Sequence, residues 1–136
     1  MNLHIFSTRE QAEANCAQLI SNQISIKPTS NLGLATGGTP VGVYTRLIDL
    51  FHNRKLTMRE VTSFNLDEYL GLEQGHHQTY RSFMEDKLFN HLDIKIYNTF
   101  FPQNKVNYDK LIELHGGIDL QLLGLGSNGH IAFNEP

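Results

Sequence analysis

Short apolar runs alternate with amphipathic segments along most of this chain. The apolar runs, each compact enough for a buried strand, lie at residues 3–6, 32–35, 61–66 and 118–125. Apolar side chains at helical spacing fill the stretches between them, at residues 9–22, 41–52, 79–92 and 107–115. Strands that alternate with helices form βαβ units, so the pattern predicts an α/β fold. We expect an open, mostly parallel, Rossmann-like sheet with helices on both faces.

Local signals at the ends of these segments support the assignment. Ser7 and Glu10 have the spacing of a capping box, and Pro40 suits the first turn of a helix. Gly116 and Gly117 end the helix that precedes the last apolar run. Residues 95–104 carry a mixed signal, which we interpret as a short strand that includes Ile94, Ile96 and Tyr97 and ends at Phe101 and Pro102. We find no internal repeat or linker, so residues 1–136 are expected to form one domain, or part of one.

Three unusual loops each follow directly from a predicted strand. They lie at residues 36–40, 67–69 and 126–130. In an open parallel sheet, the loops after the carboxyl ends of the strands share one edge, where ligands bind. The three loops should therefore converge, although the sequence separates them widely.

The first loop has features that suit a phosphate. Gly37 and Gly38 permit close approach of the backbone, Thr36 and Thr39 add hydroxyl groups, and the following helix presents its amino end. The Walker pattern and its lysine are missing, so this is not a nucleotide P-loop. An ordinary turn between strand and helix is the alternative that the glycines alone leave open.

The other two loops carry groups that can move protons. Of Asp67 and Glu68, only one can point into a cleft from an extended segment, and we choose Asp67 because it lies at the strand end. A solvated acidic corner is the alternative for this pair. His130 titrates near neutral pH, and Glu135, five positions later, can orient its ring. Surface decoration is the alternative for the His130–Glu135 pair.

Composition narrows the class of protein. The 136 residues include 11 Lys and Arg against 14 Asp and Glu, a net charge of −3, with no basic stripe for nucleic acid. Cys16 is the only cysteine, and the histidines lack metal-ligand spacing, so we expect no disulfide and no metal. No secretion signal or membrane-spanning run is found. We expect a soluble, cytoplasmic protein whose partner is a small molecule.

Three motifs resemble one known family. They are ATGGTP at residues 35–40, FNLDEY at residues 64–69, and the segment from GIDL at residues 117–120 to NGHIAFNEP at residues 128–136. In this order they resemble glucosamine-6-phosphate deaminase. The resemblance implies amino-sugar catabolism: an aldose–ketose isomerisation with loss of ammonia, giving fructose 6-phosphate without metal or organic cofactor. The related 6-phosphogluconolactonases share the glycine loop but not the continuation to Glu135.

The resemblance also implies roles for matched residues. Asp67 moves a proton from C2 of the opened sugar toward C1, and His130 serves ring opening with support from Glu135 and Asn128. Many relatives have aspartate at the position of Asn128. The amide of Asn128 can form hydrogen bonds but carries no charge. The family's chain continues past residue 136 and supplies an arginine and a lysine for the phosphate. We therefore expect this chain to be an N-terminal portion that is inactive alone.

Three alternatives stay open at this stage. The first is a 6-phosphogluconolactonase-like enzyme, and the second is another sugar-phosphate enzyme of the same superfamily. The third is a truncated protein that binds a sugar phosphate without turnover. The sequence also leaves a homo-oligomer open.

Overall fold

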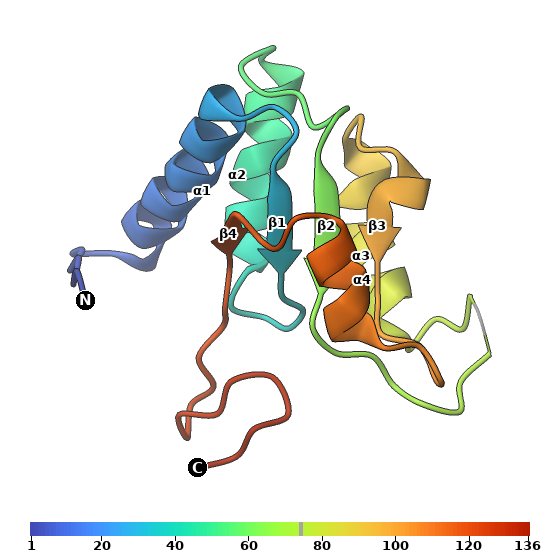
Figure 1. Cartoon of the computed structure of the whole chain (residues 1–136). Helices are drawn as coiled ribbons and strands as arrows, with labels where there is room; N and C mark the ends of the chain where they lie inside the picture. Colours follow the sequence, from blue (N-terminus) through green and yellow to red (C-terminus); the bar gives the residue numbers. More distant parts are fainter. Residues whose placement is uncertain (74) are drawn as a thin grey trace.

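The computed structural model describes residues 1–73 and 75–136, and its centre is a four-stranded sheet (Figure 1). The strands are β1 (Asn31–Leu34), β2 (Thr62–Asn65), β3 (Thr99–Phe100) and β4 (Leu120–Gln121). They lie in the order β3-β2-β1-β4, and every neighbouring pair is parallel. The predicted open parallel sheet is therefore confirmed.

Four α-helices surround this sheet. They are α1 (Arg9–Ile26), α2 (Val41–His52), α3 (Tyr80–Lys87) and α4 (Tyr108–Leu114), with 3-10 turns at η1 (Phe89–His91) and η2 (Ile96–Asn98). Helices α2 and α3 cover one face with α1 beside α2, whereas α4 crosses the opposite face (Figure 1). Both faces carry helices, as the pattern predicts. Within the described residues, no helix is long and apolar enough to cross a bilayer.

The main core lies between the sheet and the helices α1 to α3. Leu32 and Leu34 of β1 pack there with Tyr44 and Leu47 of α2 and Met84 of α3, all at most 2% exposed. The opposite face is held by aromatic rings, which stack or meet edge to face: Phe64 and Phe100 of the sheet with Tyr108 and His115 at α4. Side chains alternate across the strands, so one strand contributes to both layers.

Several predicted boundaries need correction. The cap of α1 is Thr8, whose Oγ1 accepts the Gln11 N–H at 3.2 Å, and the helix continues to Ile26 rather than residue 22. The predicted helix 79–92 ends at Lys87 and gives way to a 3-10 turn. The predicted short strand that ends at Phe101 is present but covers only Thr99–Phe100, where the chain pairs with β2, and Ile96–Asn98 before it form a 3-10 turn.

Of the two outermost predicted strands, the one at residues 3–6 is wrong and the one at residues 118–125 is too long. Residues 3–6 form no strand, and Leu3 and Ile5 are 77% and 84% exposed. A strand needs a partner for its backbone groups, and no described strand lies beside this segment. In the run at 118–125, Leu120 and Gln121 pair with Leu32 and Gly33 of β1, and the backbone N–H groups of Asp119 and Leu122 donate to the carbonyl oxygens of Asn31 and Gly33, so the strand is shorter than predicted.

One carboxylate joins the start of β1 to the start of β4. Both oxygens of Asp119 lie 2.8 Å from Lys27 Nζ, and Oδ2 also accepts the backbone N–H of Asn31 at 2.8 Å. The side chain of Asn31 in turn donates to the carbonyl oxygens of His115 and Gly117, each at 2.7 Å. These bonds fix the turn that delivers β4 to the sheet.

The Asp119 contacts generate a prediction for stability. The hydrogen bond from Lys27, then that from Asn31, lowers the pKa of the Asp119 carboxyl. A lowered folded-state pKa stabilises the fold above the ordinary aspartate pKa, and this contribution is lost as pH falls through the folded value. We expect Asp119→Asn to lower the free energy of unfolding by about 1–2 kcal/mol at pH 7.

Urea unfolding of both proteins at pH 7 and pH 3 measures this effect. The difference between wild type and Asp119→Asn should shrink at the lower pH. Glu60→Gln is the control, because the exposed Glu60 makes no hydrogen bond or ion pair within residues 1–73 and 75–136. An equal loss in both variants would remove Asp119 from this structural role.

Candidate active site

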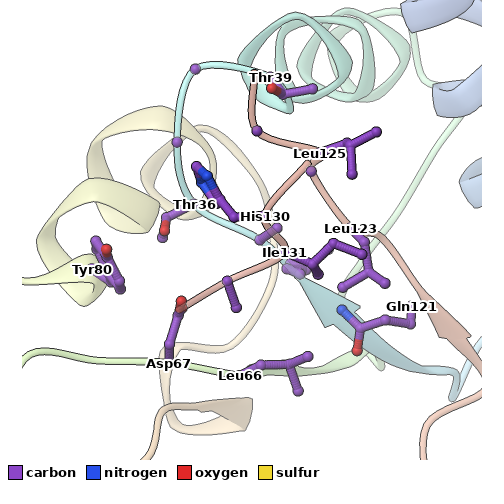
Figure 2. A pocket seen from close by; sticks show the side chains of 17 residues that line it. Thr36, Thr39, Leu66, Asp67, Tyr80, Gln121, Leu123, Leu125, His130 and Ile131 are labelled. Carbon is purple, nitrogen blue, oxygen red and sulfur yellow. The ribbon is translucent and has the colours of Figure 1, made fainter. Parts of the chain in front are cut away.

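The three loops meet at the carboxyl edge of the sheet, as predicted. They surround a cavity of about 310 Å³ next to the ends of β1, β2 and β4 (Figure 2). The cavity lies where the chain order reverses: β2 is on one side of β1, and β4 returns to the other side. Such a switch point is where parallel α/β sheets bind ligands.

Tyr44 fixes the beginning of the glycine loop from below. Its fully buried hydroxyl accepts the Ala35 N–H at 3.1 Å and donates to the carbonyl oxygen of the same residue. Burial raises the pKa of this phenol, which keeps it neutral. Gly37 has a φ of +96°, a conformation that side chains strongly disfavour. Thr36, Gly37, Gly38 and Thr39 all line the cavity.

Arg9 holds the same loop from outside the cavity. Its Nη2 donates to the carbonyl oxygen of Gly38 at 3.0 Å, and its Nε lies 2.7 Å from Glu13 Oε1. In a trans peptide the C=O and the following N–H point in opposite directions. The Thr39 N–H therefore points away from Arg9. The sequence analysis did not connect Arg9 with this loop.

The amino end of α2 continues the anion-binding character of the loop. Its N-cap, Pro40, supplies no side-chain hydrogen bond, and the first turn holds no acidic residue. The first N–H groups of a helix have no partner within the helix, and the helix dipole is positive there. This helix end can therefore bind an anion such as a phosphate.

Asp67 lies at the end of β2 and lines the cavity, whereas Glu68 does not. Burial, and then the charge of Glu68, raises the pKa of the Asp67 carboxyl. The choice of Asp67 over its neighbour as the residue facing the cleft is confirmed. Glu68 is not a solvated acidic residue: its carboxylate accepts the backbone N–H groups of Tyr80 at 2.8 Å and Arg81 at 3.0 Å.

His130 reaches the cavity from the terminal loop and is the start of a polar chain. Its Nδ1 lies 2.6 Å from Asn128 Oδ1, and Asn128 Nδ2 donates to Glu135 Oε2 at 2.8 Å. Because Oδ1 of Asn128 accepts, Nδ1 carries the proton, and Nε2 of a neutral ring is left as a proton acceptor. Asn128 and Glu135 are thus brought to His130, although neither lines the cavity itself.

Gly126 provides the room that His130 occupies. A Cβ at this position would lie between 2.2 and 2.7 Å from three atoms of the imidazole ring. The loop is closed by two backbone hydrogen bonds, from Gly126 N to His130 O at 2.8 Å and from Gly129 N to Gly126 O at 2.9 Å. The terminal segment therefore has a defined turn that aims the ring at the cavity.

Sequence reasoning missed two further side chains of the cavity wall. Tyr80 begins the helix predicted at residues 79–92; it packs against the core and also lines the cavity, and its hydroxyl donates to that of Tyr69 at 3.3 Å. Burial and the contact with Tyr69 raise its pKa. Gln121 packs against Gly33, and a Cβ added at position 33 would overlap the side-chain amide of Gln121. A polar residue within an apolar run was the signal that could have found it.

The cavity wall is poor in positive charge. Asp67 is the carboxylate and His130 the imidazole, and the described residues of the wall include neither lysine nor arginine. In Figure 2 the side chains of Asp67, His130, Tyr80 and Thr36 border one side of the pocket, and Gln121 lies on the other. The arrangement suits proton transfer on a polar molecule whose anionic group lies at the glycine loop.

Comparison with known proteins agrees with this geometry. Residues 7–133 match the family described as glucosamine-6-phosphate isomerases/6-phosphogluconolactonase. The chain belongs to this family. It is 46% identical over 141 residues to a glucosamine-6-phosphate deaminase of Mycoplasma mycoides and 47% identical over 144 residues to one of Clostridium perfringens. These matches cover 100% of this chain but 58% and 60% of the relatives.

Solved structures show the same relation within this family. A monomeric glucosamine-6-phosphate deaminase superimposes with a TM-score of 0.92 at 39% identity, covering 100% of this chain and 60% of that protein. A 6-phosphogluconolactonase from Thermotoga maritima has a TM-score of 0.70 at 21% identity, over 97% of this chain and 62% of its own, and shows the shared fold alone. The chain thus spans about three fifths of the length of its relatives.

The contact between Gly126 and His130 can be tested on the chain of 136 residues. We expect Gly126→Ala to displace the imidazole and break its bond to Asn128. The ¹⁵N shifts of the ring at pH 8 report this change as a loss of the preference for the proton on Nδ1. Gly124→Ala is the matched control, since its Cβ meets only Thr39, at 3.6 Å or more. Unchanged ring shifts in Gly126→Ala would contradict the packing described above.

Proposed function

We propose that the protein converts glucosamine 6-phosphate and water into fructose 6-phosphate and ammonia, a step of amino-sugar catabolism. The observation that carries this proposal is the convergence of Asp67, His130 and the glycine loop on one cavity of about 310 Å³. This volume is in the range of small-molecule sites. Relatives that are 39–47% identical over the whole of this chain are named as this deaminase. On this proposal the partner is a sugar phosphate, and the enzyme acts in the cytoplasm.

The phosphate binds at the glycine loop and the first turn of α2. The cavity wall includes residues 37–39, whose backbone N–H groups can donate to an anion, and α2 begins directly after this loop. Backbone amides compensate a phosphate dianion less well than the bidentate contact of an arginine. Since the described wall of the cavity lacks a cation, residues 1–136 by themselves should bind the substrate weakly.

The reaction then needs proton transfers at two places on the sugar. His130 Nε2 takes the proton of the anomeric hydroxyl and passes it to the ring oxygen as the bond between C1 and that oxygen breaks, which opens the ring to the aldehyde. Asp67 then removes the proton from C2 while the aldehyde oxygen gains a proton from solvent, which gives an enolamine. Asp67 returns its proton to C1, so that the amine-bearing C2 becomes an iminium group. Water adds to this carbon and releases a proton to solvent, and ammonia leaves as the C2 carbonyl forms, giving the ketose. Each step moves protons or water, so no redox cofactor is part of the proposal.

Asn128 suits the chain that supports His130. As an amide it accepts from His130 Nδ1 and donates to Glu135 at the same time. An aspartate could accept from the histidine but would repel the carboxylate of Glu135 at this distance. We propose that Asn128 and Glu135 hold His130 in the tautomer with Nε2 free, and that Asn128 does so without adding charge.

Assay of the product of the complete gene tests this function. Release of ammonia and fructose 6-phosphate from glucosamine 6-phosphate supports it. Hydrolysis of a 6-phosphogluconolactone without ammonia would favour the lactonase alternative, and binding without turnover would favour a non-catalytic role. The 136-residue chain should turn over at least about 10²-fold more slowly than any longer active product, because a substrate displaced by about 1 Å loses this much rate. A rate within tenfold would contradict our account of phosphate positioning.

Asp67→Asn should remove most of the turnover of the active protein while substrate binding survives. An amide keeps the shape of the carboxylate but cannot accept the C2 proton, and such groups contribute about 10²–10⁴-fold. Exchange of the C2 hydrogen with solvent should fall together with kcat. Because the pKa of Asp67 is raised, the acid limb of the kcat/KM profile should lie above the ordinary aspartate pKa of about 4.

Asp49→Asn, on the exposed side of α2, is the control for this substitution. It also replaces a carboxylate by an amide but lies outside the cavity wall. Near wild-type C2 exchange in Asp67→Asn would exclude Asp67 as the base.

A further inference from the structure

We propose that Glu68 is a positioning residue for this site: its carboxylate anchors the Asp67 segment to the amino end of α3. The inference rests on the proposed function only for the statement that Asp67 is the base. The anchoring itself concerns the geometry of two neighbouring carboxylates and one helix end. Glu68 makes no contact with the cavity, so it acts through Asp67 and Tyr80.

The hydrogen bonds of Glu68 connect segments that are distant in sequence. Oε1 accepts the N–H of Tyr80 at 2.8 Å, and Oε2 accepts the N–H of Arg81 at 3.0 Å. Oε1 also accepts the adjacent Tyr69 N–H at 2.9 Å. The carboxylate thus satisfies two of the orphan donors of α3 and places its negative charge at the positive end of that helix.

Helix α3 has a second, local cap. Thr79 Oγ1 accepts the N–H of Ser82 at 3.1 Å and also lies 2.9 Å from the carbonyl oxygen of His76 in the turn before the helix. The first turn of α3 is therefore held both by a local side chain and by Glu68 from the end of β2. Because Thr79 and Glu68 cap the same helix from different segments, substituting each in turn separates a loss of helix stability from a loss of the connection to the Asp67 segment.

The other end of the connection is firmly attached to the sheet. Arg81 donates through Nη2 to the Thr99 carbonyl oxygen at 3.0 Å and through Nη1 to Thr99 Oγ1 at 3.2 Å. Its guanidinium also lies over the Phe101 ring, 4.5 Å from the centroid. The start of α3 is thereby fixed to β3, so Glu68 joins the end of β2 to a point that the neighbouring strand holds.

Asp67 lies in a segment without helix or strand structure, where backbone pairing cannot hold it. Glu68 is bound to the start of α3, whereas its predecessor Asp67 lines the cavity beside Tyr80. Because the two residues are adjacent in the chain, fixing Glu68 on α3 limits the positions that Asp67 can take. The same anchor also sets Tyr80, because this residue begins the helix that Glu68 caps.

The charge of Glu68 has a separate effect on Asp67. After burial, this charge is the next cause of the raised pKa of the Asp67 carboxyl. Two substitutions can therefore distinguish charge from anchor. Glu68→Gln removes the charge and replaces one acceptor by a donor, whereas Glu68→Asp keeps the charge but is one methylene too short to reach both N–H groups.

Carboxyl ¹³C titration of the chain of 136 residues tests the inference without any need for turnover. We expect Glu68→Gln to lower the pKa of Asp67, through loss of the neighbouring charge. Amide shifts should change at residues 67, 80 and 81 in both Glu68 variants. Thr79→Ala is the matched control, and it should leave the Asp67 pKa and the residue 67 amide unchanged. Equal changes in Thr79→Ala would reduce Glu68 to an ordinary helix cap.

Turnover by the active gene product supplies the second measurement. We expect Glu68→Gln and Glu68→Asp to lower kcat at least tenfold with KM within about threefold, while Thr79→Ala stays within threefold in kcat. Urea midpoints show whether each variant is folded, and Glu68→Asp decides if Glu68→Gln does not fold. A kcat of the folded Glu68 variants equal to that of Thr79→Ala would overturn the inference. If the wild type releases no ammonia, the proposed function fails, and the titration alone decides on Glu68.

Discussion

The parallel pairing of β1 with both of its neighbours is the constraint on which the site depends. β1 pairs with β2 over four residues and with β4 over two, and all three strands run in the same direction. Their carboxyl ends must therefore lie together, and the glycine loop, Asp67 and the His130 loop follow from those ends. The buried Asn65 strengthens this edge, since its Nδ2 donates to the Leu34 carbonyl oxygen at 3.1 Å.

Each loop is then fixed by a side chain that satisfies backbone groups or other side chains. Tyr44 holds Ala35 at the start of the glycine loop, Glu68 caps α3, and Asn128 joins His130 to Glu135. Loops lack the ladders that hold strands, so their polar groups need such partners. Residues outside the cavity thus decide where the groups inside it point, and this explains why Glu68 and Tyr44 matter although neither is suited to touch a substrate.

Family membership and geometry agree on the division of tasks within this chain. The 136 residues carry the carboxylate, the imidazole and the amide-rich loop, whereas the described cavity wall offers no lysine or arginine. The relatives are longer, and this chain spans about three fifths of them. On the proposed function, this chain therefore carries the proton-handling residues, and it would contact a phosphate mainly through backbone N–H groups of the glycine loop.

The sequence by itself determined the fold class, the convergence of the three loops and the choice of Asp67. These features depend on hydrophobic periodicity and on the rule that parallel strands share a carboxyl edge, and both are local or topological. Tertiary structure decided what needs a partner in space. Residues 3–6 have the composition of a strand but no neighbour among the described strands. In the 118–125 run, Leu120 and Gln121 are the residues that pair with β1.

The tertiary structure also decided the roles of individual polar side chains. The sequence left Glu68 open as a solvated acid and gave Tyr80 no role beyond its helix, because spacing shows only which side of a segment a residue occupies. The structure makes Glu68 a cap of α3 and Tyr80 part of the cavity wall, because the segment after β2 lies against the start of α3. Periodicity records which residues are buried, but hydrogen-bond partners 12 or 13 residues away are set by the packing of whole elements.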